Sequence, residues 1–165
     1  MRSLVGFPEI VNEKAARVVA TGVATLSAIV LLAGAQWLLP IMALGFLLRV
    51  LSGPRFSPLG LLATKVVAPR LGAPRLVAGA PKRFAQGIGL ATTAAATILG
   101  PVLGLHAAAA GLAAVLLLFA SLEAGIGFCA GCWAYGQLIR AGVFPEEACV
   151  ACSDISLRRA EVVTS

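Results

Sequence analysis

The sequence is short of charged residues. Of its 165 residues only 12% are Asp, Glu, Lys or Arg, against roughly 25% in soluble domains, while 59% are hydrophobic. The mean hydropathy is +0.96. So few charges cannot cover the surface of a soluble protein of this size. The composition therefore excludes an ordinary cytosolic enzyme and a disordered regulator, and it predicts a membrane protein.

Catalytic side chains are also scarce. His106 is the only histidine, and no acid or cysteine lies near it in the sequence. We find no Ser, His and Asp set, no phosphate-binding glycine loop and no paired catalytic carboxylates. Hydrolase and nucleotide-binding functions therefore have no support, and we interpret His106 as a residue of a membrane-surface turn.

Charge is absent from two long stretches of the chain. No charged residue lies between Arg17 and Arg49, and none lies within 84–122. One membrane crossing takes about 20 apolar residues, so each stretch can hold two spans, with turns at 34–36 and at 100–104. We expect an all-α membrane protein with a four-transmembrane-helix bundle. Its predicted spans lie near 16–34, 36–52, 84–102 and 106–128.

The basic residues fall on one side of this arrangement. With four spans, the N-terminus, the central loop and the C-terminus share the side that has all 13 Lys and Arg. The turns on the other side have none, which is the distribution that the positive-inside rule predicts for a cytoplasmic face. We expect both termini in the cytoplasm, a membrane domain over 1–142 and a short cytoplasmic tail over 143–165.

The loop of residues 53–83 is basic and rich in proline. Ser57-Pro58 predicts a helix N-cap with proline in the first turn, and the apolar residues after it predict a short helix at the membrane interface. The basic residues either bind anionic membrane lipids or only fix the topology. Nucleic-acid binding would need interleaved aromatic residues, and the loop has only Phe56, so we expect no nucleic-acid partner.

Four cysteines form two CxxC pairs, Cys129 with Cys132 and Cys149 with Cys152. Sixteen residues separate the pairs, which fits the spacing of a zinc site with four cysteine ligands. We expect the helix of the last span to continue past Cys132 and to end at Gly142, after which the chain turns back. The four thiolates would then clamp a structural zinc ion, in a protein that is not an enzyme.

The same pairs also suit thiol–disulfide exchange, because a CxxC in a reducing compartment is more often redox-active or metal-binding than a structural disulfide. Two expectations oppose easy redox chemistry. Cys129 and Cys132 would lie within a helix, where a disulfide is strained, and not at a helix start, where the helix dipole lowers a thiol pKa. Arg83 or Arg140 would have to lower that pKa instead. Spacing alone does not separate zinc from redox chemistry.

Glu123 is the only acid between Glu13 and Glu146. An ionisable group within a span is a candidate functional residue. It would relay protons to a thiol or to a bound quinone, or it would pair with Arg49 or Lys82 and tie two helices together. Both interpretations stay open.

Three blocks carry a family resemblance, at residues 53–59, 81–89 and 123–135, the last reading EAGIGFCAGCWAY. Together they resemble a bacterial integral-membrane family, domain of unknown function 4395. The resemblance implies a four-span protein of the bacterial inner membrane. It also implies partners of the thioredoxin-like or rhodanese type, which favours thiol or sulfur-transfer chemistry at Cys129, Cys132, Cys149 and Cys152. Glu123 is the candidate proton relay for that chemistry on the grounds given above. A membrane thiol oxidoreductase is the activity we expect.

Overall fold

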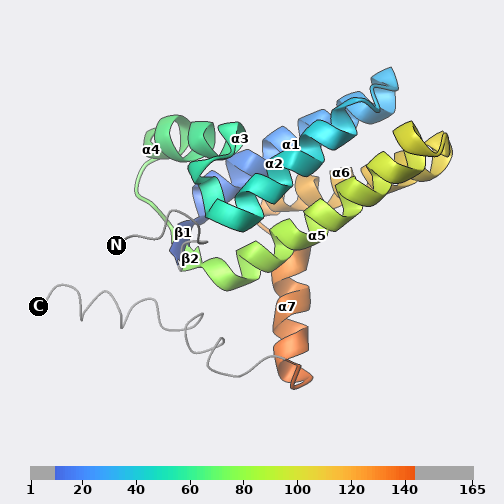
Figure 1. Ribbon diagram of the computed structural model, residues 1–165. Coiled ribbons are helices and arrows are strands. Elements are labelled where there is room, and N and C mark those ends of the chain that lie inside the picture. Colours follow the sequence, from blue (N-terminus) through green and yellow to red (C-terminus); the bar gives the residue numbers. More distant parts are fainter. Residues whose placement is uncertain (1–9, 144–165) are drawn as a thin grey trace, which may run out of the picture.

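The computed structural model describes residues 10–143, of which about 81% are helical (Figure 1). The long helices are α1 (Glu13–Ala33), α2 (Leu38–Ser52), α5 (Gly79–Thr97), α6 (His106–Ile126) and α7 (Ala130–Arg140). Shorter segments connect α2 to α5: η1 (Gly53–Arg55), α3 (Pro58–Leu62), η2 (Ala63–Val67) and α4 (Ala68–Arg70). A wide π-type turn, η3 (Ile98–Val102), ends α5.

Within residues 10–143, three helical stretches are long and apolar enough to cross a membrane: 13–33, 38–70 and 106–126. They correspond to the predicted spans at 16–34, 36–52 and 106–128. The predicted span at 84–102 lies in α5 and η3, which together do not form a fourth such stretch among the described residues. Within the predicted span, the apolar character of α5 is lowered by polar and small residues: Gln86, Gly87, Gly89, Thr92, Thr93 and Thr97.

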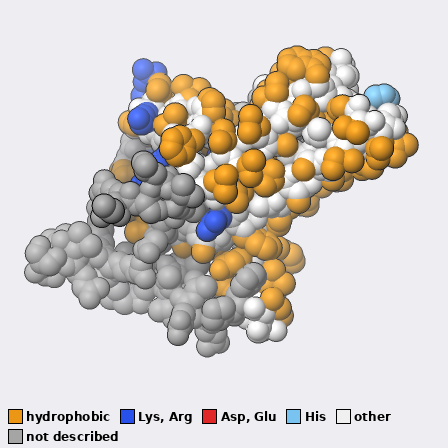
Figure 2. All heavy atoms as spheres, viewed as in Figure 1, with side chains coloured by type: hydrophobic (Ala, Val, Ile, Leu, Met, Phe, Trp, Pro, Cys, Tyr) orange, Lys and Arg blue, Asp and Glu red, His pale blue; other side chains and the backbone are white. Residues whose placement is uncertain are grey.

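The helices pack in two pairs, α1 against α6 and α2 against α5. Small residues allow the backbones to approach closely, as is common for helices in lipid. Ala109, Ala113 and Ala120 of α6 are buried in the core beside Val19 and Val30 of α1. Many large apolar side chains remain on the outside (Figure 2). An apolar exterior around a core of small residues is the packing expected of helices that face lipid.

The predicted turns are confirmed. Gly34 ends α1 with φ of +64°, and Gly104 precedes α6 with φ of +73°. Ser57 caps α3, since its hydroxyl accepts a hydrogen bond from the amide of Gly60, and Pro58 follows in the first turn. Each position follows from the preference of its own residues, namely glycine for a positive φ and serine followed by proline for a helix start.

A two-stranded antiparallel sheet was not predicted. Strand β1 (Ile10–Asn12) pairs with β2 (Leu76–Ala78), in the register Ile10 opposite Ala78. The pairing joins the start of α1 to the start of α5, and Asn12 caps α1 by accepting a hydrogen bond from the amide of Lys14 at 3.0 Å. Strands of three residues have no periodicity that a sequence pattern could reveal.

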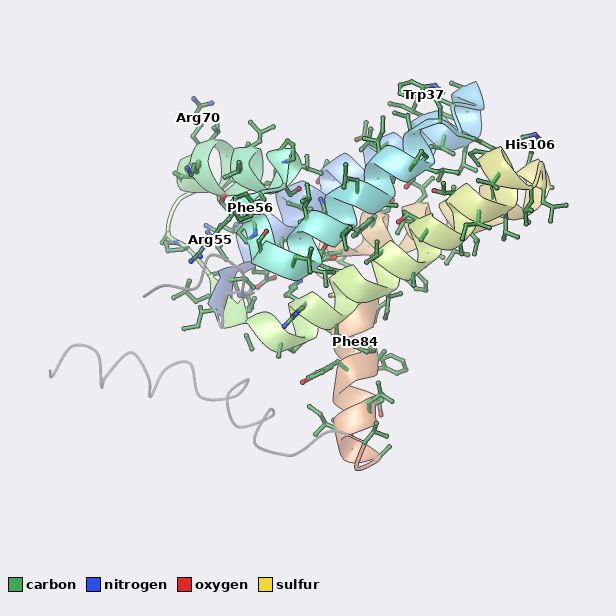
Figure 3. All side chains as sticks on the ribbon, in the orientation of Figure 1. Trp37, Arg55, Phe56, Arg70, Phe84 and His106 are labelled. Carbon is green, nitrogen blue, oxygen red and sulfur yellow. The ribbon has the colours of Figure 1, made fainter. Side chains whose placement is uncertain are left out.

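The polar groups lie at opposite ends of the long helices. Arg55 and Arg70 project at the end formed by α3 and α4, while Trp37 and His106 mark the other end (Figure 3). Gln36 and His106 contact each other there, with 2.7 Å between Gln36 Oε1 and His106 Nδ1. His106 is exposed, but it is the first residue of α6 and not part of the turn that precedes it.

The prediction of one continuous helix from α6 to Gly142 is wrong. Helix α6 ends at Ile126, and Gly127 takes the left-handed conformation, with φ of +74°. After Phe128 and Cys129 the chain starts α7, which runs across the other helices instead of along them (Figure 1). The end of α7 agrees with the prediction, because Gly142 follows Ala141 with φ of +76°.

Candidate functional site: a dithiol at a helix start beside a buried ion pair

The break after α6 is held by Arg17 of α1. Its guanidinium donates hydrogen bonds to the carbonyl of Ala124, at 3.1 and 3.2 Å, and to the carbonyl of Gly125. These carbonyls belong to the last turn of α6, where no further amide of the helix can reach them. A cation at this end also matches the negative end of the helix dipole. Arg17 therefore stabilises the end of α6 just before the cysteines.

Cys129 is the N-cap of α7. Its backbone is extended, with φ of −99° and ψ of 103°, and its sulfur accepts a hydrogen bond from the amide of Cys132 at 3.4 Å. The prediction that the pair does not begin a helix is therefore wrong. Because the chain leaves α6 at Gly127, the CxxC occupies the first turn of a new helix, where free amides and the helix dipole favour a thiolate.

The two thiols differ in acidity. A hydrogen bond from the Cys132 thiol and the charge of Lys82 lower the pKa of Cys129, although burial and the charge of Glu123 oppose this. The pKa of Cys132 is raised, first by its hydrogen bond to Cys129 and then by burial. Both cysteines are free and half-buried. The arrangement is that of a dithiol in which Cys129 is the more acidic member and Cys132 the less acidic one.

Glu123 pairs with Lys82, one of the two partners predicted for it. Lys82 Nζ lies 2.5 Å from Glu123 Oε1, and the side chains are only 10% and 18% exposed. The pair joins α5 to α6 one turn before the helix break. Lys82 is also the cation that acts on the cysteines, in place of the expected Arg83 or Arg140.

Arg49 forms a second polar group near this pair. Its Nε donates to Gln86 Oε1 at 2.8 Å, and its guanidinium lies 4.4 Å from the centre of the Phe46 ring. Arg49 is 6% exposed. Arg49 therefore links α2 to α5 through Gln86. Of the two partners predicted for Glu123, Lys82 is the one that contacts it.

Gly131, between the two cysteines, brings α7 close to α5. A Cβ atom built on Gly131 would lie 2.5 Å from Ala85 Cβ and 2.6 Å from Ala85 Cα. The backbones touch at this point, three residues along α5 from Lys82. A glycine inside a CxxC motif indicates such an approach, but the sequence does not say which helix approaches.

Cys149 and Cys152 lie outside the described residues. Within 10–143 no group of three or more His, Cys, Asp or Glu could hold a metal ion. The zinc site that combines both cysteine pairs therefore stays a prediction. The dithiol of Cys129 and Cys132, with Glu123 and Lys82 beside it, is the site that can be described.

Two contributors to this site were not predicted. Arg17 was counted only as a topology-fixing charge, and Lys82 only as a partner of Glu123. The signal for a helix break was present in Gly125, Gly127 and the glycine of the CxxC, since clustered glycines indicate a turn. The apolar character of the run from 106 to 133 concealed it.

The fold and the site define a helical protein with membrane-spanning capacity and a CxxC dithiol at a helix start. The profile of a protein family described only as a domain of unknown function, DUF4395, matches residues 11–140. The chain belongs to this family. The match includes Glu123, Cys129 and Cys132 and ends before Cys149. No curated protein and no solved structure matches the chain.

Proposed function

We propose that the chain is a membrane thiol oxidoreductase whose working dithiol is Cys129 and Cys132. The observation that carries the proposal is the position of Cys129 as the N-cap of α7, hydrogen-bonded to Cys132 and close to Lys82. Cysteines at helix starts beside a cation are the reactive ones, whereas buried structural cysteines are inert. Because its thiolate is stabilised, Cys129 leaves readily when a mixed disulfide at this residue is opened.

The exchange runs through a mixed disulfide. With the pair oxidised, a thiolate of a reduced thioredoxin-like partner attacks Cys129 Sγ, and the Cys132 sulfur leaves with the electron pair and takes a proton. The partner's second thiolate then attacks its own sulfur in the mixed disulfide and releases the Cys129 thiolate. The partner ends as a disulfide, and the pair ends as a dithiol. Two electrons have passed from the partner to the membrane protein.

The membrane arrangement belongs to the same proposal. Helices α1, α2, α5 and α6 cross the bilayer of the bacterial inner membrane, with both termini and the cysteines in the cytoplasm. The separation of Arg55 and Arg70 from Trp37 and His106 along the helices supports this orientation (Figure 3). Helix α5 crosses despite Lys82, because the ion pair with Glu123 lowers the cost of its charge.

The redox proposal is tested on full-length protein in which Cys149 and Cys152 are both serine. After oxidation, peptide mass spectrometry should find a Cys129–Cys132 disulfide that reduced thioredoxin opens. With oxidised thioredoxin as the disulfide donor, a further Cys132→Ser change should form a mixed disulfide at Cys129, and a further Cys129→Ser change should form none. Absence of the disulfide, or exchange no faster than with an unfolded CxxC peptide, would refute the proposal.

The orientation has its own test. A cysteine introduced by Gln36→Cys should react with an impermeant maleimide added outside intact cells, whereas one introduced by Arg70→Cys should react only after lysis. The reverse pattern would place the dithiol outside the cytoplasm and overturn the orientation.

A further inference from the structure

A cavity of about 480 Å³ lies beside the dithiol, between α1, α5, α6 and α7. Its walls are mainly apolar, and it extends along α6 from Val115 to Glu123, which is about 12 Å of helix rise. Polar side chains gather at one end, where Glu123, Gln86 and Cys129 line it. Its volume is within the range of roughly 300–1,000 Å³ that is usual for small-molecule sites.

Aromatic side chains form the outer wall. Phe119, Phe128 and Trp133 line the cavity and are 44%, 42% and 60% exposed. In a chain whose helices cross a bilayer, a partly open apolar wall faces lipid. A ligand would therefore enter from the membrane, with its apolar part along α6 and its polar part at the cysteines.

We propose that this cavity binds a membrane quinone, and that the dithiol reduces it. The proposal rests on the thiol oxidoreductase function and names its electron acceptor. A lipid acyl chain would fit the apolar walls equally well, but it has no polar group for the end that Cys129, Gln86 and Glu123 line. A quinone has carbonyl oxygens that accept a hydrogen bond from the Gln86 amide or from a thiol, a flat ring to lie against aromatic side chains and an apolar tail.

The reaction balances between the dithiol and the quinone. A Cys129–Cys132 disulfide bond forms, and two electrons pass to the quinone ring. The two ring oxygens take two protons, and a quinol results. The two protons are those of the Cys129 and Cys132 thiols, so no further proton donor is needed. The quinone is reduced and the dithiol is oxidised.

The test fills the cavity without touching the cysteines. Thr92 lines the cavity away from the dithiol, and its neighbour Ala91 is exposed and is not a lining residue, so Thr92→Phe and Ala91→Phe form a matched pair. Each full-length variant is reduced in lipid nanodiscs and mixed with decylubiquinone, whose fully substituted ring does not add thiols. Quinol is followed by absorbance, and the loss of two hydrogens from the protein by intact mass.

The wild type and Ala91→Phe should form quinol and disulfide in equal amounts. Thr92→Phe should need at least about tenfold more quinone for the same rate, equal to about 1.4 kcal/mol of binding, and should exchange thiols with thioredoxin normally. Should Thr92→Phe fail to fold, Val115→Phe, with the exposed and non-lining Leu118→Phe as control, makes the same test from α6.

Two results would overturn the quinone site. One is equal quinone dependence in the filled variant and its control. The other is a wild type that exchanges thiols with thioredoxin and leaves the quinone oxidised, in which case the proposed function stands and the acceptor is wrong. Loss of thioredoxin exchange in the wild type would refute the oxidoreductase function and the quinone site together.

Discussion

Gly131→Ala is the substitution that should separate the position of the dithiol from its chemistry. The change leaves both cysteines and the ion pair intact and adds one methyl group at the contact of α7 with α5. The added carbon would lie 2.5 Å from Ala85 Cβ and 2.6 Å from Ala85 Cα. Carbon atoms pack at about 3.5–4.0 Å, so the start of α7 must move by roughly 1 Å or more.

The size of the effect follows from that clash. Part of the clash is with the backbone of α5, so no side chain can rotate away to relieve it. Overpacking of this kind costs about 1–3 kcal/mol. Gly136→Ala on the same helix is the control, because a Cβ there meets nothing within 4 Å. Alanine is favoured over glycine within a helix by about 1 kcal/mol, so the control should be slightly more stable than the wild type.

The assay combines two measurements on detergent-purified protein. Thermal unfolding should place Gly131→Ala below the wild type and Gly136→Ala at or above it. Alkylation of Cys129 at neutral pH should slow in Gly131→Ala alone, because α7 moves away from Lys82 and the thiolate loses a stabilising charge. Equal unfolding temperatures and equal alkylation rates in the two variants would show that α7 does not pack on α5 as described.

Three further predictions concern the groups around the dithiol. When alkylation is measured against pH, the midpoint pH of Cys129 should lie below that of an ordinary thiol and the midpoint of Cys132 above it. Lys82→Met should raise the Cys129 midpoint. Two identical midpoints would contradict the assigned acidities. Lys82→Met should also destabilise the protein by about 3–5 kcal/mol, because it leaves the Glu123 carboxylate unpaired. In unfolding measurements, adding Glu123→Gln should recover most of this loss. Additive losses of the two substitutions would show that the two residues are uncoupled. Arg17→Ala should lower the free energy of unfolding by about 1–3 kcal/mol and slow Cys129 alkylation, because it removes hydrogen bonds at the end of α6. Arg17→Lys should recover only part of the stability. Unchanged unfolding of Arg17→Ala would contradict this role.

The features that the sequence predicted correctly are those set by local rules. The turns at Gly34 and Gly104, the cap at Ser57 and the end of α7 before Gly142 depend on single residues and their neighbours. The long apolar helices follow from composition alone. The pairing of Glu123 with Lys82 was one of two predicted pairings, and Arg49 was the other candidate. A partner was expected because an unpaired charge within an apolar stretch is costly.

The start of α7 at Cys129 was not predicted, because hydrophobicity and helix breaking gave opposite signals. Residues 106–133 are apolar almost throughout, which favours one long span, while Gly127 permits a left-handed turn. The turn is stable because Arg17, more than a hundred residues earlier in the chain, donates to the carbonyls of Ala124 and Gly125. A long-range contact of this kind leaves no local signal in the sequence.

The helix break also determines the surroundings of both cysteines. In an uninterrupted helix the amide of Cys132 would bond to the carbonyl of Phe128, four residues before it, and no free amides would face Cys129. Ending α6 at Gly127 frees those amides, and Gly131 then lets the new helix lie against α5 where Lys82 emerges. Without either glycine the same two cysteines would be buried thiols on a helix face. The lowered pKa of Cys129 therefore depends on the helix break. Substitutions at Arg17 and Gly131 should for this reason change the reactivity of Cys129, although neither residue is a cysteine.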